Sequence, residues 1–86
     1  MDKESIFAVV KANVLRVLGD VDESEIAAHK SLVDLGANSV DRVEVAMYTM
    51  EQLDLKIPRM ELSEARNIQG LVDILYKHCN GAQQIR

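Results

Sequence analysis

The sequence contains little cysteine and few aromatic residues, which limits the metal sites, disulfides and core packing that are available to it. Cys79 is the only cysteine among the 86 residues, which excludes an internal disulfide and a multi-cysteine metal site. Tryptophan is absent, and Phe7, Tyr48 and Tyr76 are the only aromatic residues. A core must therefore be built from Val, Leu, Ile, Met and Ala. A chain this short buries only about 60–65% of its unfolded surface, which leaves room for a binding platform but little for a deep catalytic cleft.

Long apolar runs are also missing. No stretch of the chain approaches the ~18 apolar residues that a membrane helix needs. No charged-then-apolar leader opens the sequence. We therefore expect a cytoplasmic protein without a membrane partner.

Positive charge is scarce in the middle of the chain. Residues 20–54 hold nine acidic and two basic residues, a net charge of −7, whereas the rest of the chain carries +3. Nucleic acid is not expected as a partner, because phosphate binding requires a basic patch. The acidic segment instead favours basic protein partners, which electrostatic attraction steers into short-lived encounters.

Apolar residues recur at helical spacing in three long stretches, and no stretch alternates apolar and polar residues as a strand does. The spacing predicts an all-α fold, a four-helix bundle with three long helices and a short third one. The predicted helices cover residues 3–18, 39–53, 60–65 and 68–78. Asn67 is predicted to cap the last helix and Asn80-Gly81 to end it. Residues 1–86 are expected to form one domain, with 80–86 as a frayed tail.

The second predicted helix and the loop before it carry the most specific structural expectations. The inward stripe of this helix is predicted to consist of Val40, Val43, Met47 and Met50, with Ala46 and Leu53 alongside. The residues left for solvent or partners are Asp41, Arg42, Glu44, Thr49, Glu51 and Gln52. Loop 19–38 is predicted to contain a short helical piece over 24–28, capped by Asp22. It is expected to be pinned across the core by Val21, Ile26, Leu32 and Leu35, because structureless loops of this length are uncommon.

Ser39 lies where a glycine turn enters the second predicted helix. Its simplest interpretation is a helix cap, since Ser at such a junction accepts an orphan backbone N–H. An anion attached there would meet the positive end of the helix dipole, so the position also suits a phosphate ester. A hydrolase nucleophile is disfavoured, because Ala37 and Asp41 replace the glycines of the Gly-x-Ser-x-Gly elbow. His29 and His78 have neither a catalytic nor a metal-ligand context.

The stretch around Ser39 resembles acyl carrier proteins. Acyl carrier proteins share the pattern G-x-[D/x]-S-[L/x]-D-x-V-E. The residues of this chain that match it are Gly36, Ser39, Val40, Asp41, Val43 and Glu44. In that family the pattern surrounds a serine that carries 4′-phosphopantetheine. The resemblance extends from the first helix to about Cys79, with one departure: Asn38 replaces the usual aspartate. The residues from Gly36 to Arg42 look most like the free-standing carriers of polyketide β-branching cassettes.

The resemblance implies a carrier protein, not an enzyme. A phosphopantetheinyl transferase would attach 4′-phosphopantetheine from coenzyme A to Ser39, and the thiol of the arm would hold acyl groups as thioesters. For a β-branching donor the implied cargo is acetyl, arising from decarboxylated malonyl. The other implied partners are an HMG-CoA-synthase-like enzyme, an acyltransferase and a decarboxylating ketosynthase-like enzyme. The carrier is expected to be a monomer whose partner-binding residues are Asn38, Val40, Asp41, Arg42, Glu44 and Glu51.

Two alternatives remain open from the sequence. A peptidyl or aminoacyl carrier of nonribosomal peptide synthesis has the same build, and a plain helical interaction module would leave Ser39 unmodified. The acidic second helix and the small Val/Met core favour the acyl carrier over the peptidyl carrier.

Overall fold

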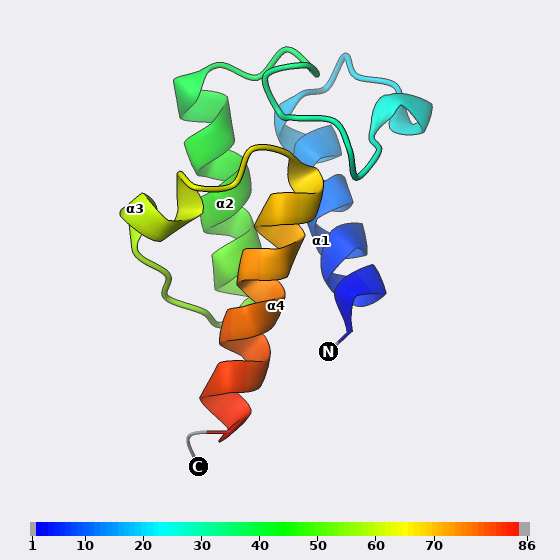
Figure 1. Cartoon of the computed structure of the whole chain (residues 1–86). Helices are drawn as coiled ribbons and strands as arrows, with labels where there is room; N and C mark the ends of the chain where they lie inside the picture. The colour runs from blue at the N-terminus through cyan, green and yellow to red at the C-terminus, as the bar shows by residue number, and fades with distance from the viewer. Residues whose placement is uncertain (1, 85–86) are drawn as a thin grey trace.

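All regular secondary structure in the described part of the chain is helical. The computed structural model describes the backbone of residues 2–84 and the side chains of residues 2–79. Its elements are α1 (Lys3–Val17), the 3-10 helix η1 (Glu23–Glu25), α2 (Ser39–Leu53), α3 (Arg59–Leu62) and α4 (Ile68–Gln84) (Figure 1). Because no strand occurs between residues 2 and 84, the predicted all-α bundle of three long helices and one short helix is confirmed.

The long helix α1 packs against both α2 and α4, and the short α3 lies at the outside of the bundle against α4 (Figure 1). The buried apolar cluster consists of Ile6, Val10, Val14, Ile26, Val45, Ile57, Ile68, Leu71, Val72 and Leu75. It contains no aromatic residue, and Phe7 and Tyr76 only pack at its edge. Burial of this aliphatic surface, worth about 25 cal/mol per Å², is the main favourable term that holds the helices together.

Side chains at the helix starts accept backbone N–H groups that have no partner within the helix. Asp2 accepts the N–H of Ser5 at the start of α1. Asn67 accepts the N–H of Gly70 at the start of α4, so the predicted cap is confirmed. Asp22 caps η1 as predicted, although this element covers 23–25 rather than 24–28.

Other helix boundaries also differ from the sequence prediction, by one residue at the end of α1 and by more in α3 and α4. Helix α4 continues through Asn80 and Gly81 to Gln84, so the predicted end at these residues was wrong. A glycine inside a helix costs only about 1 kcal/mol relative to alanine and does not by itself end a helix. Helix α3 covers Arg59–Leu62 rather than 60–65. Residues 85 and 86 of the predicted tail lie outside the described residues.

The rotation of α2 about its axis also differs from the prediction. Val45 and Thr49 are fully buried, whereas Val40 and Met47 are 66% and 55% exposed. The predicted inward stripe was therefore wrong for Val40 and Met47, and the prediction that Thr49 faces solvent was wrong as well.

A polar contact between α1 and α2 accounts for this rotation. Asn13 of α1 is buried, and its Nδ2 donates to Thr49 Oγ1 at 2.9 Å and to Gln52 Oε1 at 3.1 Å. Thr49 Oγ1 in turn donates to the Val45 carbonyl at 2.8 Å. A buried amide without partners would cost about 1–3 kcal/mol, so the two polar side chains stabilise one another inside the core. A hydrophobicity pattern does not reveal such a pair.

The Asn13–Thr49 contact predicts a specific stability loss. We expect Thr49→Val, which keeps the side-chain shape but removes the hydroxyl, to lower the free energy of unfolding by about 1–2 kcal/mol. Ser63→Ala is the matched control, because its hydroxyl is exposed and bonds only the Met60 carbonyl. Urea denaturation followed by circular dichroism measures both variants. Equal stability of Thr49→Val and the parent would show that the buried pair does not set the position of α2.

Candidate functional site

The loop before α2 is held in place by its own hydrogen bonds and by the start of α4. The N–H groups of Ile68 and Gln69 donate to the carbonyls of Lys30 and Ala28 at 2.9 and 2.8 Å. The side chain of Ile26 is buried in the core, as predicted. The loop therefore enters α2 from a fixed position rather than from a mobile tether.

The last turn of the loop is built by reciprocal side-chain bonds. Ser31 N–H donates to Asp34 Oδ2 at 3.1 Å, and Asp34 N–H donates to Ser31 Oγ at 3.0 Å. The bond from the Ser31 backbone lowers the pKa of Asp34 below its usual value, with a second contribution from the Ser31 hydroxyl. Gly36 follows in the predicted glycine turn, with a φ of +96°. Any L side chain at Gly36 would be strained there.

Asn38, and not Ser39, is the cap of α2. Asn38 Oδ1 accepts the backbone N–H of Asp41 at 2.8 Å, and Asp41 Oδ2 accepts the N–H of Asn38 at 3.2 Å. Two orphan donors of the helix start are satisfied by this reciprocal capping box. The interpretation of Ser39 as the cap was therefore wrong. Ser39 is the first helical residue, and its hydroxyl is not used to hold the helix.

The Ser39 hydroxyl is exposed and lies beside a positive charge. Its Oγ accepts a hydrogen bond from Arg42 Nη2 at 3.3 Å. No imidazole or carboxylate among the described residues bonds to Oγ. His78 is instead paired with Glu61 at 2.8 Å. Ser39 thus has no general base of its own, whereas the helix start and the guanidinium favour an anion at this oxygen.

The remaining predicted binding residues fall on two sides of α2. Glu44 is half-buried, Glu51 is exposed, and the exposed Val40 and Met47 alternate with them along the helix. Positions 40, 44, 47 and 51 are spaced by three and four residues and share one helix face. We call these four residues the docking face. Asp41 is not part of the docking face, because its carboxylate accepts the Asn38 N–H in the capping box.

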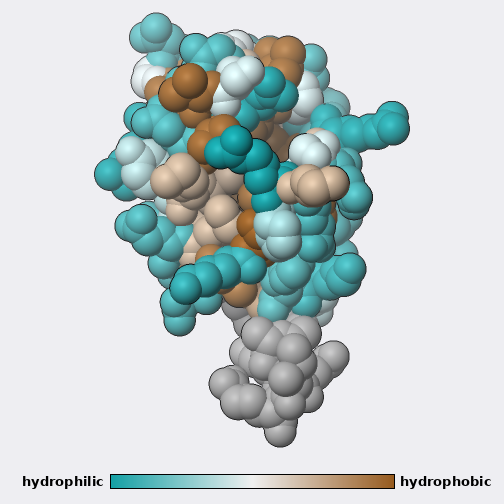
Figure 2. All heavy atoms as spheres, turned by 90° about the vertical axis from the view of Figure 1, so that its left-hand side faces the viewer, coloured by the Kyte–Doolittle hydropathy of each residue, from teal (hydrophilic) through white to brown (hydrophobic). Residues whose placement is uncertain are grey.

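A groove of about 440 Å³ opens between α2, α3 and the adjoining loops, and Ser39 lies on its lining. Apolar side chains from α2, α3 and α4 contribute Val43, Ala46, Met47, Met50, Leu62 and Leu71. Figure 2 shows apolar surface on this side of the molecule, crossed by hydrophilic side chains. Arg42, Arg59 and Arg66 also line the groove. The sequence prediction missed Arg59 and Arg66, since only the packing of α3 against α4 brings them opposite α2.

No other candidate site competes with this one in the described part of the chain. Between residues 2 and 84 no group of three or more His, Cys, Asp or Glu side chains is placed to hold a metal ion. No helix there is long and apolar enough to cross a membrane. The exposed Ser39 at the start of α2, with the groove beside it, is therefore the candidate site.

Comparison with known proteins identifies the carrier class. Residues 8–75 match the family model of the phosphopantetheine attachment site. The polyketide biosynthesis acyl-carrier-protein AcpK of Bacillus subtilis (strain 168) is 44% identical over 82 residues, which are 95% of this chain and 100% of that protein. An acyl carrier protein of Cyanidioschyzon merolae (strain NIES-3377 / 10D) is 35% identical over 85 residues, 98% of this chain and 92% of that protein.

A solved structure supports the same assignment. A chain of the crystal structure of the curacin biosynthetic pathway HMG synthase in complex with acetyl donor-ACP superimposes with a TM-score of 0.80 and 37% identity. The match covers 87% of this chain and 96% of that chain. The protein therefore belongs to the phosphopantetheine-dependent acyl carrier family, whose members carry acyl groups on covalently bound 4′-phosphopantetheine for partner enzymes and are not enzymes themselves.

The assignment of the cap to Asn38 predicts unequal effects of two neighbouring substitutions. We expect Asn38→Ala to lower the free energy of unfolding by about 1 kcal/mol, because it removes the acceptor for the Asp41 N–H. Ser39→Ala should change stability by less than about 0.5 kcal/mol, as for other exposed positions without a structural role. Thermal melts of the two variants and the parent test this order. A larger loss for Ser39→Ala would contradict the assigned cap.

Proposed function

We propose that this protein is the donor acyl carrier of a polyketide β-branching pathway, with 4′-phosphopantetheine attached to Ser39. The observation that carries the proposal is the exposed Ser39 hydroxyl at the start of α2, beside Arg42 and at the edge of an apolar groove. The likeness to AcpK supports a polyketide pathway, and the likeness to an acetyl donor-ACP bound to HMG synthase supports the donor role.

Ser39 and Arg42 have different roles at the attachment point: Ser39 carries the arm, and Arg42 stabilises its phosphodiester. A phosphopantetheinyl transferase would supply the base that takes the Ser39 proton, because no group of the described chain is placed to do so. Ser39 Oγ would form the bond to the phosphorus of the arm, the pyrophosphate bond of coenzyme A would break, and adenosine 3′,5′-bisphosphate would leave. The resulting phosphodiester carries a negative charge next to the Arg42 guanidinium and the N-terminus of α2, both of which stabilise it. The thiol of the arm then holds the acyl group as a thioester.

The docking face fits basic partners with apolar contact residues. Glu44 and Glu51 supply negative charge, and Val40 and Met47 supply apolar surface that is exposed in the free carrier. Charge steers the encounter, and burial of the apolar side chains stabilises the complex after docking. The proposed partners are the transferase, an HMG-CoA-synthase-like enzyme, an acyltransferase and a decarboxylating ketosynthase-like enzyme.

Attachment at Ser39 is tested by intact-mass spectrometry. After incubation with coenzyme A and a phosphopantetheinyl transferase, the parent should gain one phosphopantetheine mass and Ser39→Ala none. Ser5→Ala is a matched control, because Ser5 is also an exposed serine in the first turn of a helix. A mass gain in Ser39→Ala would place the arm elsewhere. No gain in the parent would leave the chain as an unmodified interaction module.

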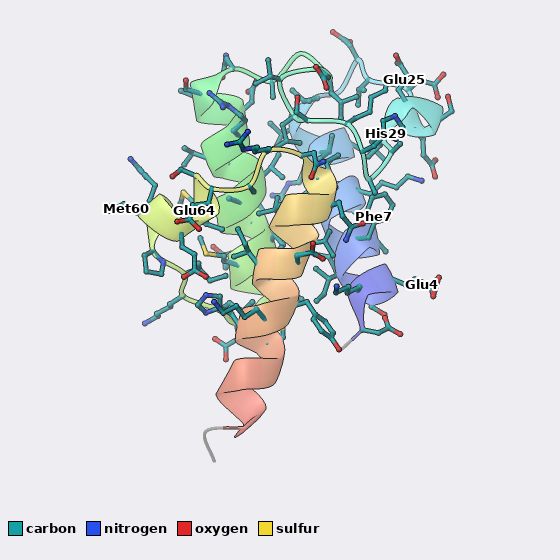
Figure 3. All side chains as sticks on the ribbon, viewed as in Figure 1. Glu4, Phe7, Glu25, His29, Met60 and Glu64 are labelled. Carbon is teal, nitrogen blue, oxygen red and sulfur yellow. The ribbon has the colours of Figure 1, made fainter. Side chains whose placement is uncertain are left out.

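Recognition by the docking face is tested with charge reversal at two salt concentrations. We expect Glu44→Lys to slow acyl transfer to an HMG-CoA-synthase-like partner by roughly tenfold at low salt, with the difference shrinking as salt screens the charges. Glu4→Lys makes the same charge change on α1, at a position that Figure 3 shows away from α2 and α3. It should transfer at the parent rate. Equal rates for Glu44→Lys and Glu4→Lys would move recognition away from α2.

A further inference from the structure

The groove beside Ser39 has an unusual charge for this protein. Its lining includes the three arginines Arg42, Arg59 and Arg66 and no acidic residue. The whole chain has a formal net charge of −4, and the segment that contains α2 is its most acidic part. The groove is therefore a local cationic site in an acidic carrier.

These guanidinium groups are not neutralised by the protein. Arg42 donates to the neutral Ser39 hydroxyl, and neither Arg59 nor Arg66 forms an ion pair with any described residue. Elsewhere lysines do find acidic partners, as in the contact of Lys3 with Asp73 at 3.0 Å and that of Lys11 with Glu23 at 3.3 Å. The positive charge of the groove is thus available to a ligand.

The apolar lining of the groove indicates what the rest of such a ligand must be like. Ala46 and Met50 of α2 line it together with Leu62 of α3 and Leu71 of α4, and the pocket surface is mainly apolar. An occupant that fits has a short apolar body and an anionic end. Because Ser39 lies on the lining, a group tethered to Ser39 reaches the floor within the same molecule, at an effective concentration on the order of millimolar.

Resting on the proposed attachment at Ser39, we propose that this groove binds a carboxylate-bearing acyl group on the carrier's own arm, malonyl, in preference to acetyl. Arg59 and Arg66, from α3 and the segment after it, bind the free carboxylate, for which the planar guanidinium offers paired N–H donors. Arg42 lies at the Ser39 end and neutralises the phosphodiester.

A preference for malonyl would let the groove act before decarboxylation and release the acetyl group afterwards. Decarboxylation replaces the carboxylate of malonyl by a proton and releases CO₂, so the acetyl product lacks the group that Arg59 and Arg66 bind. The malonyl form is retained at the carrier until a decarboxylating partner acts. The acetyl form is released to the enzyme that accepts it. The groove thereby distinguishes the two loaded states without performing chemistry.

Two-dimensional ¹H–¹⁵N spectra of the intact carrier test this preference. Four states are compared: unmodified, and loaded by a transferase from coenzyme A, acetyl-coenzyme A or malonyl-coenzyme A. We expect malonyl to shift the amides of residues 59–66 relative to acetyl, with little difference at Glu4, Phe7 and Glu25, which do not line the groove and lie away from α2 and α3 in Figure 3.

Charge-matched variants identify the groups that bind the carboxylate. Arg59→Gln and Arg66→Gln should each reduce the malonyl-specific shifts by about half or more, and Arg66→Lys should retain part of them. Lys56→Gln is the control, because it removes one exposed positive charge that does not line the groove. Circular dichroism of each variant verifies that the bundle is folded, so that a lost shift reports on binding.

The possible outcomes separate this inference from the function on which it rests. Intact mass is measured first, and a parent chain that gains no arm overturns both. Loading with identical acetyl and malonyl spectra overturns the malonyl preference alone. The preference is also overturned if Arg59→Gln and Arg66→Gln leave the malonyl-specific shifts as large as Lys56→Gln does.

Discussion

The rotation of α2 about its axis is the constraint on which the rest of the structure depends. A buried polar contact between α1 and α2 fixes it: Asn13 donates to Thr49 and to Gln52. An unsatisfied donor or acceptor at these buried positions would be costly. At the start of α2 the exposed capping box is formed by Asn38 and Asp41, so the Ser39 hydroxyl does not cap the helix and lies at the surface.

The same rotation divides the surface of α2 between two tasks. One side presents the docking face, in which acidic and apolar side chains alternate at helical spacing. The adjoining side forms a wall of the groove, where the lining arginines carry the opposite charge, and Met47 lies at the boundary. A partner with a basic surface is attracted to the first side and repelled by the second. The proposed cargo site and the docking face are therefore adjoining surfaces of one helix, and Met47 belongs to both.

A bundle of this size suits a protein that performs no chemistry of its own. The core is aliphatic and small, and in the described structure no acid–base pair surrounds Ser39. The exposed apolar side chains, with Met60 on α3 83% exposed as well, leave surface for transient contacts with several enzymes. Most of the buried apolar cluster lies on α1 and α4, with Val45 from α2, whereas the residues proposed for function lie mostly on α2 and α3.

The sequence by itself determined the all-α class, the extent of α2 and the position of Ser39. These features depend on local patterns: apolar residues at helical spacing, and a glycine turn before a capped helix. Tertiary structure decided which face of α2 is buried. The polar side chains of Asn13 and Thr49 are stable in the core only because they bond to one another across two helices. Tertiary structure also decided that Arg59 and Arg66 share a groove with Ser39. Contacts between residues distant in sequence leave no periodic signal, so only the packed chain reveals them.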